Sequence, residues 1–222
     1  MTTPNIRLLP IDLPTPQRGY MPLRYSRTWR SEFELAVPSQ PGVEVFLTPK
    51  AYVRANVHAQ SDLENEVGGW LIGSWREDQE TGQEFIVVER CLPALYARRG
   101  SAYLTFTQDS QVAMFEIMEE KFPDKELVGW YHTHPKMGVF LSNYDLFLHT
   151  HFFPHPWQVA LVIEPHTNVA GFFIKDQEGN LDARYYYGFH ELTGGGTKSV
   201  VRWGNLTEEF TGSPEELENT NE

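Results

Sequence analysis

The pattern of apolar and polar positions predicts alternating strands and helices between about residues 43 and 192. Apolar, β-branched or alternating runs of strand length, bounded by turn residues, favour extended segments. Capping signals and apolar residues at helical spacing favour helices. The predicted strands are 43–47, 69–75, 85–90, 127–134, 159–163, 169–174 and 185–189, and the predicted helices are 48–63, 108–122 and 142–152.

Two segments of this region carry more specific expectations. The predicted helix at 108–122 has apolar residues that keep largely to one side, namely Val112, Phe115, Ile117, Met118 and Phe122. We therefore expect that side to be the apolar face of the helix. The segment 93–103, which contains the run Arg98-Arg99-Gly100-Ser101, is predicted to be an exposed loop.

The two ends of the chain differ in composition from this central part. Residues 1–42 contain seven prolines, which disfavour regular helix and predict an extended arm, although 25–37 could add an edge strand. Residues 207–222 contain six glutamates and are too polar to bury much surface. We therefore expect three parts: a Pro-rich N-terminal arm at 1–42, a folded domain at 43–192, and an acidic, disordered C-terminal tail at 193–222.

Composition and charge narrow the class of protein. The 222 residues are 41% hydrophobic and 14% aromatic, enough for one good core. Eighteen Lys and Arg against thirty Asp and Glu give a formal net charge of -12, which disfavours nucleic acid and anionic membrane partners. Cys91 is the single cysteine, and no run of about 20 apolar residues is present. We expect a cytoplasmic protein with Cys91 in the core.

A candidate metal site lies at the end of the predicted strand 127–134. Side chains two apart on a strand point to the same face, so His132 and His134 can converge on one ion. Asp145, on the first turn of the following helix, is the candidate third ligand. Three protein ligands with one open position are typical of a catalytic zinc, although this ligand set also suits other divalent ions.

The chemistry of such a site also needs a carboxylate that is not a ligand. A catalytic zinc lowers the pKa of water at its open position to about 7, and a nearby carboxylate can carry the proton to the leaving amine. Glu66, between the first helix and the strand 69–75, is the candidate, and Glu64 is a weaker substitute. Ser142 is a candidate hydrogen-bond donor toward the oxyanion.

Each of these signals alone also has an ordinary structural explanation. Two strand histidines need no metal, and Ser142 with Asp145 also reads as a helix capping box. His149 could orient Asp145 through a hydrogen bond, or it could simply be solvated. The run His149-Thr150-His151 invites a second zinc site, but residues two apart on a helix point to different sides. The combination of all the signals is what favours a single catalytic site.

The combined motif resembles a known family. The string His132-x-His134-Pro135-(x)6-Ser142-x-x-Asp145 resembles the JAMM signature of the MPN-plus (JAB/MPN) metallopeptidases, which release ubiquitin or ubiquitin-like proteins. This resemblance implies the MPN/JAB fold, of the α/β (mixed α+β) class. That fold has a central mixed, mostly antiparallel, curved sheet flanked by about three helices, and it is similar to that of cytidine deaminases.

Two further blocks are similar to the same family. Residues 66–73 resemble the block in which a glutamate precedes a Gly-x-apolar-apolar-Gly strand, and 157–165 resemble the strand after the third helix. The resemblance implies one catalytic Zn²⁺ held by His132, His134 and Asp145, with Glu66 and Ser142 as catalytic residues. Its size makes the chain similar to stand-alone bacterial members that act beside ubiquitin-like modifier systems.

The resemblance implies a zinc-dependent (iso)peptidase that cuts after the C-terminus of ubiquitin or a ubiquitin-like modifier. The modifier or its conjugate would be the substrate, with E1/E2-like proteins as possible pathway partners. In the family the modifier tail lies extended beside the site, where Arg98, Arg99 and Tyr103 are candidate substrate contacts. Two alternatives stay open: an MPN scaffold that binds partner proteins without catalysis, and a JAMM hydrolase acting on a small amide.

Overall fold

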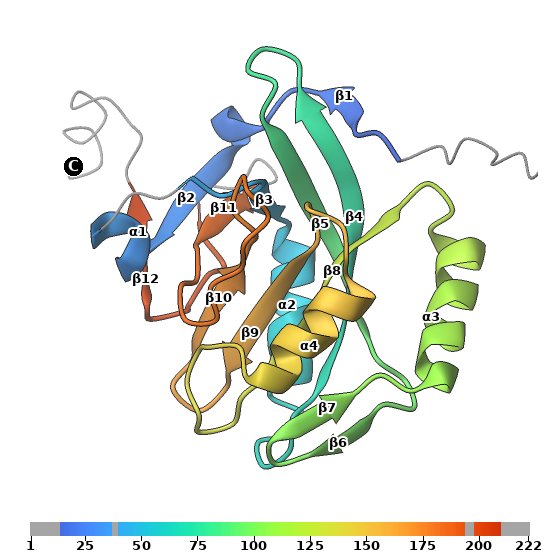
Figure 1. Ribbon diagram of the computed structural model, residues 1–222. Helices are drawn as coiled ribbons and strands as arrows, with labels where there is room; N and C mark the ends of the chain where they lie inside the picture. The colour runs from blue at the N-terminus through green and yellow to red at the C-terminus, as the bar shows by residue number, and fades with distance from the viewer. Residues whose placement is uncertain (1–13, 37–39, 194–197, 210–222) are drawn as a thin grey trace, which may run out of the picture.

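A computed structural model describes residues 14–36, 40–193 and 198–209, which build one large mixed sheet with helices around it (Figure 1). The helices are α1 (Glu32–Ala36), α2 (Pro49–Ala59), α3 (Gln108–Lys121) and α4 (Asn143–Phe152). The strands are β1 (Gln17–Gly19), β2 (Ser26–Ser31), β3 (Glu44–Leu47), β4 (Gly68–Asp78), β5 (Glu84–Pro93), β6 (Arg98–Gly100), β7 (Tyr103–Thr105), β8 (Glu126–Thr133), β9 (Val159–Glu164), β10 (Val169–Phe173), β11 (Phe189–Leu192) and β12 (Leu206–Glu209).

The sheet mixes parallel and antiparallel pairings, as predicted. Its strand order is β10-β9-β8-β4-β5-β3-β11-β2-β12, with β1 pairing beside β4. Strands β4 and β5 form the long antiparallel hairpin that the sequence predicts, and β4 also pairs antiparallel with β8. In contrast, β8 and β9 run parallel, with α4 in the crossover between them. A small hairpin of β6 and β7 forms a second sheet.

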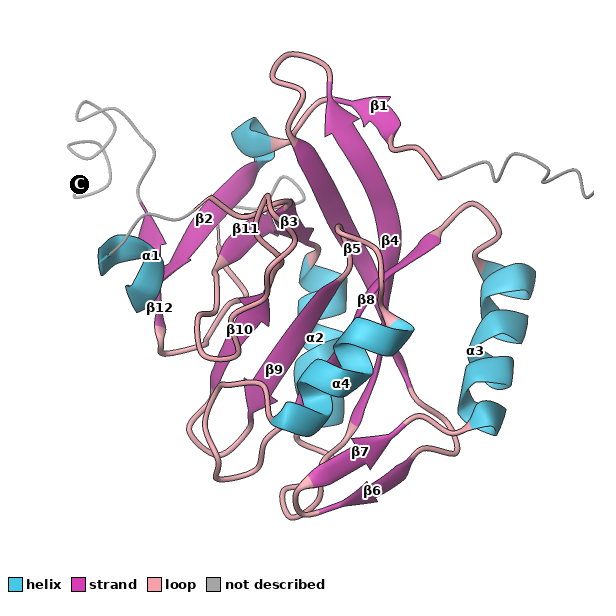
Figure 2. Cartoon of the chain, viewed as in Figure 1, coloured by secondary structure: helices cyan, strands magenta, loops and turns pink. Residues whose placement is uncertain are grey.

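Helices α2 and α4 lie on opposite sides of the sheet, with α4 in front of it and α2 behind it in Figures 1 and 2. The Thr48 side chain caps α2 by accepting from the amide of Ala51, and Pro49 occupies the first turn. The helix ends at Ala59 and not near residue 63. Asp62 accepts amide hydrogen bonds from Glu64 and Asn65, so this segment forms a turn instead.

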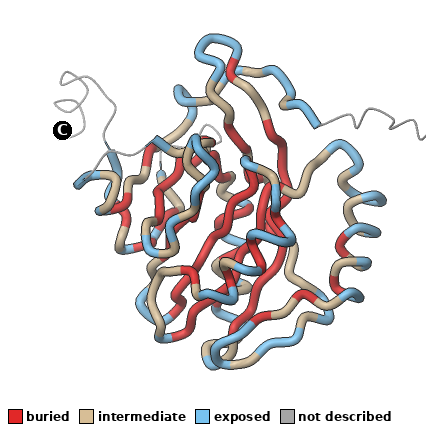
Figure 3. Tube along the Cα trace, viewed as in Figure 1, coloured by how far each residue is buried: buried red, intermediate tan, exposed pale blue. Residues whose placement is uncertain are grey.

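The most deeply buried strands run through the centre of the sheet (Figure 3). All six residues of β9 are buried, as are the last six of β8. Strand β4 approaches β8 so closely that a Cβ atom at Gly68 would overlap the carbonyl oxygen of Tyr131, which explains glycine there. The core therefore surrounds the strand that carries His132. Cys91 is buried on β5, as expected.

The folded unit extends beyond the predicted boundaries at 43 and 192. Strand β2 lies between β11 and β12, so the expectation of an edge strand at 25–37 is wrong in position. In the expected acidic tail, Trp203 is 1% exposed, and its indole N–H donates to Asn56 of α2. Strand β12 then pairs with β2. Residues 1–13 and 210–222 of the predicted arm and tail lie outside the described residues.

Three local expectations also need correction. Helix α3 is present, but its apolar side is only partly packed: Met118 and Phe122 contact the core, whereas Val112 is 48% and Phe115 61% exposed. The predicted loop 93–103 contains most of the β6–β7 hairpin. The last predicted strand, 185–189, is shifted: β11 begins at Phe189, because only Tyr187 of the preceding residues bridges to β10. Within the described residues, no helix has the length and apolar character that a bilayer span requires.

Candidate metal centre

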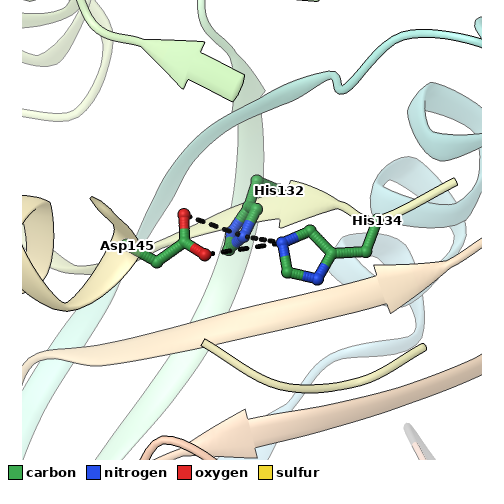
Figure 4. Close-up of side chains that lie close together, drawn as sticks. All are labelled: His132, His134 and Asp145. Carbon is green, nitrogen blue, oxygen red and sulfur yellow. Dashed lines mark hydrogen bonds and ion pairs between the residues drawn. The ribbon is translucent and has the colours of Figure 1, made fainter. Parts of the chain in front are cut away.

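The end of β8 brings two imidazoles to one point. His132 pairs with Val162 of β9, and the amide of His134 donates to the carbonyl of Ile163 at 2.9 Å. Both histidines keep the strand-like spacing that turns their side chains to one side, as the sequence predicts. Figure 4 shows the two rings pointing toward each other and toward Asp145. The Nε2 atoms of the two rings are 3.0 Å apart.

Helix α4 supplies the carboxylate through its N-terminal cap. The Ser142 hydroxyl accepts from the Asp145 amide at 3.2 Å, and the Ser142 amide donates to Asp145 Oδ2 at 2.7 Å. This capping box orients the aspartate at the start of the helix. Capping and metal binding are therefore compatible in the same two residues, and the capping explanation does not exclude the metal explanation.

The three side chains fit a divalent metal ion. Asp145 Oδ1 lies 3.3 Å from His132 Nε2, and Asp145 Oδ2 lies 3.4 Å from His134 Nε2. Ligands at about 2.0–2.1 Å from a tetrahedral zinc lie about 3.3–3.4 Å from one another, so these spacings suit a shared ion. All three residues are buried, and they form the one group of potential metal ligands among the described residues.

The electrostatics favour the protonation states that metal binding requires. Burial lowers the pKa of His132, although the charge of Asp145 acts in the opposite direction. The lowered pKa favours the neutral ring. Burial would raise the pKa of Asp145, but His132, His134 and the Ser142 side chain outweigh it and hold that pKa below its usual range. Neutral imidazoles and an ionised carboxylate are the forms that bind a metal ion.

Glu66 lies beside this group at the entry to β4. It is 3% exposed, and burial, with a further contribution from the charge of Asp145, raises the pKa of its carboxyl to about 8. A bound divalent cation would favour the ionised form. Glu64, the weaker candidate, instead forms an ion pair with Lys136 at 3.0 Å, and 75% of its side chain is exposed. Burial and the nearby charge of Asp145 both favour Glu66 over Glu64 as the carboxylate that acts beside the metal ligands.

The β6–β7 hairpin is joined directly to the Glu66 backbone. The amide of Glu66 donates to the carbonyl of Gly100 at 2.8 Å. Arg99 lies 3.9 Å from Asp62, while Arg98 and Tyr103 are exposed on the hairpin. A groove of about 260 Å³ runs beside this hairpin, lined among others by His58, Val67, Gly68, Ala94, Arg99 and Leu104. The substrate roles of Arg98, Arg99 and Tyr103 stay predictions.

His149 is neither hydrogen-bonded to Asp145 among the described residues nor solvated, the two roles considered for it from the sequence. Its ring is fully buried, and Nδ1 accepts from the indole N–H of Trp130 at 3.1 Å. His151 lies on the exposed side of α4, with Nδ1 2.7 Å from the carbonyl of Phe147. The run His149-Thr150-His151 therefore forms no second metal group among the described residues. Residues two apart diverge on a helix, which is the physical reason.

Three neighbours of the site were not identified from the sequence. Thr133 accepts from the amide of Val67 at 2.9 Å and fixes the backbone next to Glu66. The Trp130 ring stacks on His132, with centroids 4.5 Å apart. Glu164 accepts amide hydrogen bonds from Lys136, His166 and Thr167, and so holds the turn that follows His134. For Trp130 and Thr133 the available signal was proximity to the His-x-His motif, whereas Glu164 lies on the next strand of the sheet, far along the sequence.

The chain is similar in sequence to curated proteins whose names describe different activities. The chain is 25% identical to "Ubiquitin carboxyl-terminal hydrolase RPN11" of Saccharomyces cerevisiae, over 60% of this chain and 42% of that protein. It is 33% identical to "AMSH-like ubiquitin thioesterase 2" of Arabidopsis thaliana, over 42% of this chain and 34% of that protein. It is 38% identical to "NAD(+) hydrolase TcpA" of a Theionarchaea archaeon, over 28% of this chain and 20% of that protein.

These matches cover less than half of each relative, so the relatives' whole activities do not transfer directly to this chain. The family comparison covers more of the chain. The sequence model described as "JAB1/Mov34/MPN/PAD-1 ubiquitin protease" matches residues 40–153, just over half of the 222 residues. This range contains His132, His134 and Asp145 and confirms the predicted MPN/JAB fold. The chain belongs to the JAB1/Mov34/MPN/PAD-1 ubiquitin protease family.

Proposed function

We propose that this protein is a zinc-dependent isopeptidase or peptidase that hydrolyses the bond after the C-terminus of ubiquitin or a ubiquitin-like modifier. The observation that carries the proposal is the buried group His132, His134 and Asp145, with the buried carboxyl of Glu66 beside it. A scaffold has no need of a buried Glu66 whose carboxyl has no hydrogen-bond or ion-pair partner in the described part of the chain and lies near Asp145. The names of the yeast and plant relatives support a hydrolase of ubiquitin linkages.

The protein's own residues have separate roles in the proposed reaction. His132, His134 and Asp145 would hold a zinc ion, which would supply Lewis-acid activation at the scissile bond. Glu66 accepts the proton of the attacking water and passes it to the leaving amine. The Ser142 hydroxyl, whose oxygen already accepts from Asp145, keeps its own proton to donate toward the oxyanion.

The modifier tail fits the groove beside the β6–β7 hairpin. A modifier C-terminus is an extended segment, and extended segments bind by pairing with an exposed strand. In this proposal Arg98, Arg99 and Tyr103 contact the tail or the acidic residues next to it. The groove leads to Val67 and Gly68, immediately after Glu66. The scissile bond would therefore lie between the hairpin and the metal centre.

The cellular setting forms part of the same proposal. Cys91 is buried on β5, and its single thiol suits a reducing compartment, so we place the protein in the cytoplasm. The net charge of -12 is unfavourable for nucleic acid or anionic membranes. E1/E2-like proteins of a modifier pathway are the expected partners.

A cleavage assay tests the proposal directly. The zinc-loaded chain is incubated with a ubiquitin-like protein that carries a short C-terminal extension, and product is measured by mass spectrometry. We expect cleavage after the modifier's terminal residue, and a loss of about 10²–10⁴-fold for Glu66→Gln with zinc content unchanged. Glu64→Gln is the matched control and should retain activity. Equal cleavage by Glu66→Gln and wild type would contradict the role of Glu66.

A further inference from the structure

The outer face of α2 has an unusual composition for a surface helix. Lys50, Val53, Arg54 and Val57 recur at positions i, i+3, i+4 and i+7, so they lie along one face of the helix. All four are exposed, with Val53 48% and Val57 60% accessible. The opposite face, which includes Ala51, Tyr52 and Ala55, is the buried one. The outer stripe is therefore not needed for the core.

This stripe borders a groove between α2 and the end of β5. The groove has a volume of about 650 Å³, and its lining residues are Pro49, Lys50, Val53, Arg54, Val57, Arg90 and Cys91. No lining residue is acidic. None of Lys50, Arg54 and Arg90 takes part in an ion pair among the described residues. In the described part of the chain, three cations without a carboxylate partner therefore flank an apolar floor.

The surface stands out against the charge of the whole chain. The whole chain has a formal net charge of -12, whereas the groove is lined by three cations and no carboxylate. Valine is also a weaker helix former than alanine, so two exposed valines on α2 have no local benefit. The cations and the exposed valines are both accounted for if a partner surface that carries acidic and apolar residues covers the groove.

We propose that this groove docks an acidic, amphipathic helical segment of a partner protein. The partner's apolar residues would lie on Val53 and Val57, and its flanking carboxylates would meet Lys50, Arg54 and Arg90. The distance from residue 50 to residue 57 along α2 is about 10 Å, which matches two turns of a partner helix. This docking does not depend on the proposed peptidase function, because none of its residues belongs to the metal centre.

Other occupants fit these observations less well. An interfacial membrane site uses large apolar residues such as Trp, Phe and Leu with many cations, whereas this groove has two valines. Nucleic acid would meet the repulsion of the overall negative charge. A second copy of the chain would need a face that is both acidic and apolar. The chain's own segment 210–222, which contains four glutamates, is another acidic occupant to be tested. These last two occupants are outcomes that the experiment distinguishes.

The test pans the immobilised 222-residue chain against a random-peptide phage library, with the Val53→Glu variant as counter-selection. We expect enriched peptides with Glu or Asp flanking apolar residues at helical spacing. The affinity of the best peptide, measured by fluorescence anisotropy, should fall at least about tenfold with Val53→Glu and also fall clearly with Arg54→Glu. Rising salt should weaken binding.

Matched variants on α3 serve as controls. Val112→Glu changes a valine that is also 48% exposed, and Lys121→Glu changes an exposed cation; both should leave the affinity within about twofold. Circular dichroism melting checks that each variant is folded. Enrichment of peptides without acidic residues, no enrichment, or equal binding by Val53→Glu and wild type would overturn the proposal.

Two further results would assign the groove to another occupant and also overturn it. A wild-type dimer that Val53→Glu converts to a monomer would make the occupant a second copy. Tighter peptide binding by a chain ending at residue 209 would make it the protein's own acidic segment.

Discussion

Two buried histidine clusters in this molecule show how a structural histidine differs from a candidate metal ligand. His190 on β11 has a partner for each ring nitrogen: Thr28 Oγ1 is 3.0 Å from Nδ1, and Glu44 Oε2 is 3.2 Å from Nε2. The ring also stacks on Phe46. At the metal centre, His132 and His134 place their Nε2 atoms 3.0 Å from each other. Their Nδ1 atoms are buried without a hydrogen-bond partner among the described residues.

The difference lies in how the polar groups are satisfied. The His190 cluster is complete by itself, since every ring nitrogen faces an oxygen. The His132 cluster directs two nitrogens and two carboxylate oxygens toward one point, an arrangement that a cation satisfies better than protons do. A buried histidine next to a carboxylate is therefore not itself a functional signal. Convergence of several ligand atoms is the signal.

The largest expected effect comes from removing His134 of the candidate metal centre. His134→Ala should lower cleavage activity by at least about 10³-fold, because it removes a metal ligand and the electrophilic assistance the metal gives. The measurement is kcat/KM on the modifier fusion with zinc supplied. Comparable activity in His134→Ala and wild type would show that the two clusters do not differ in the way we describe.

The second effect concerns Ser142, which combines capping and donation. Ser142→Ala should lower kcat about 10²-fold by removing the oxyanion donor, and should lower the free energy of unfolding by about 1 kcal/mol by removing the cap. Ser142→Gly is the matched control, because glycine at the cap costs only a few tenths of a kcal/mol. If kcat recovers in Ser142→Gly, the hydroxyl acts through helix α4 and not on the substrate.

His190→Ala should show the opposite behaviour from His134→Ala. It should lower the free energy of unfolding by about 2–3 kcal/mol, because it opens a cavity and leaves buried polar groups unpaired. Its kcat/KM per folded molecule should stay unchanged at a temperature where the variant is folded. Urea unfolding and the same cleavage assay provide the two measurements. A variant that keeps its stability but loses activity would make His190 a functional residue.

The smallest expected effect is a pH dependence at Glu44. Burial would raise the pKa of Glu44, but the hydrogen bond and charge of His190 outweigh it and lower that pKa. The stabilisation is therefore complete above the unfolded pKa, near about 4.3, and is lost as pH falls through the lower folded value. Glu44→Gln should be less stable by about 1 kcal/mol at neutral pH. Its disadvantage should shrink below about pH 4 in urea titrations; a constant difference at all pH values would contradict this.

The sequence predicts the metal centre better than it predicts the edges of the fold. His132, His134 and Asp145 follow from local geometry, because strand alternation and a helix cap operate within a few residues. The place of strand β2 inside the sheet could not be predicted in the same way, although a strand at 25–37 was expected. Its sequence alternates little, and its partners β11 and β12 are more than 150 residues away. Long-range pairing leaves no local pattern in a single chain.

The exposed face of α3 shows the limit of periodicity. Phe115 and Val112 repeat at helical spacing, yet both are exposed in the described fold. Periodicity identifies an apolar face but does not say what that face contacts. Trp203 shows the converse, since one buried tryptophan in a polar segment is anchored by contacts with α2.

Zinc titration of the metal-free chain tests the central claim most directly. The account predicts tight binding of a single zinc ion by the wild type and by His190→Ala, and loss of that binding in His134→Ala and Asp145→Ala. Calorimetry with metal analysis of the dialysed chain gives affinity and stoichiometry together. Absence of binding in the wild type, or binding that His134→Ala leaves intact, would contradict the account.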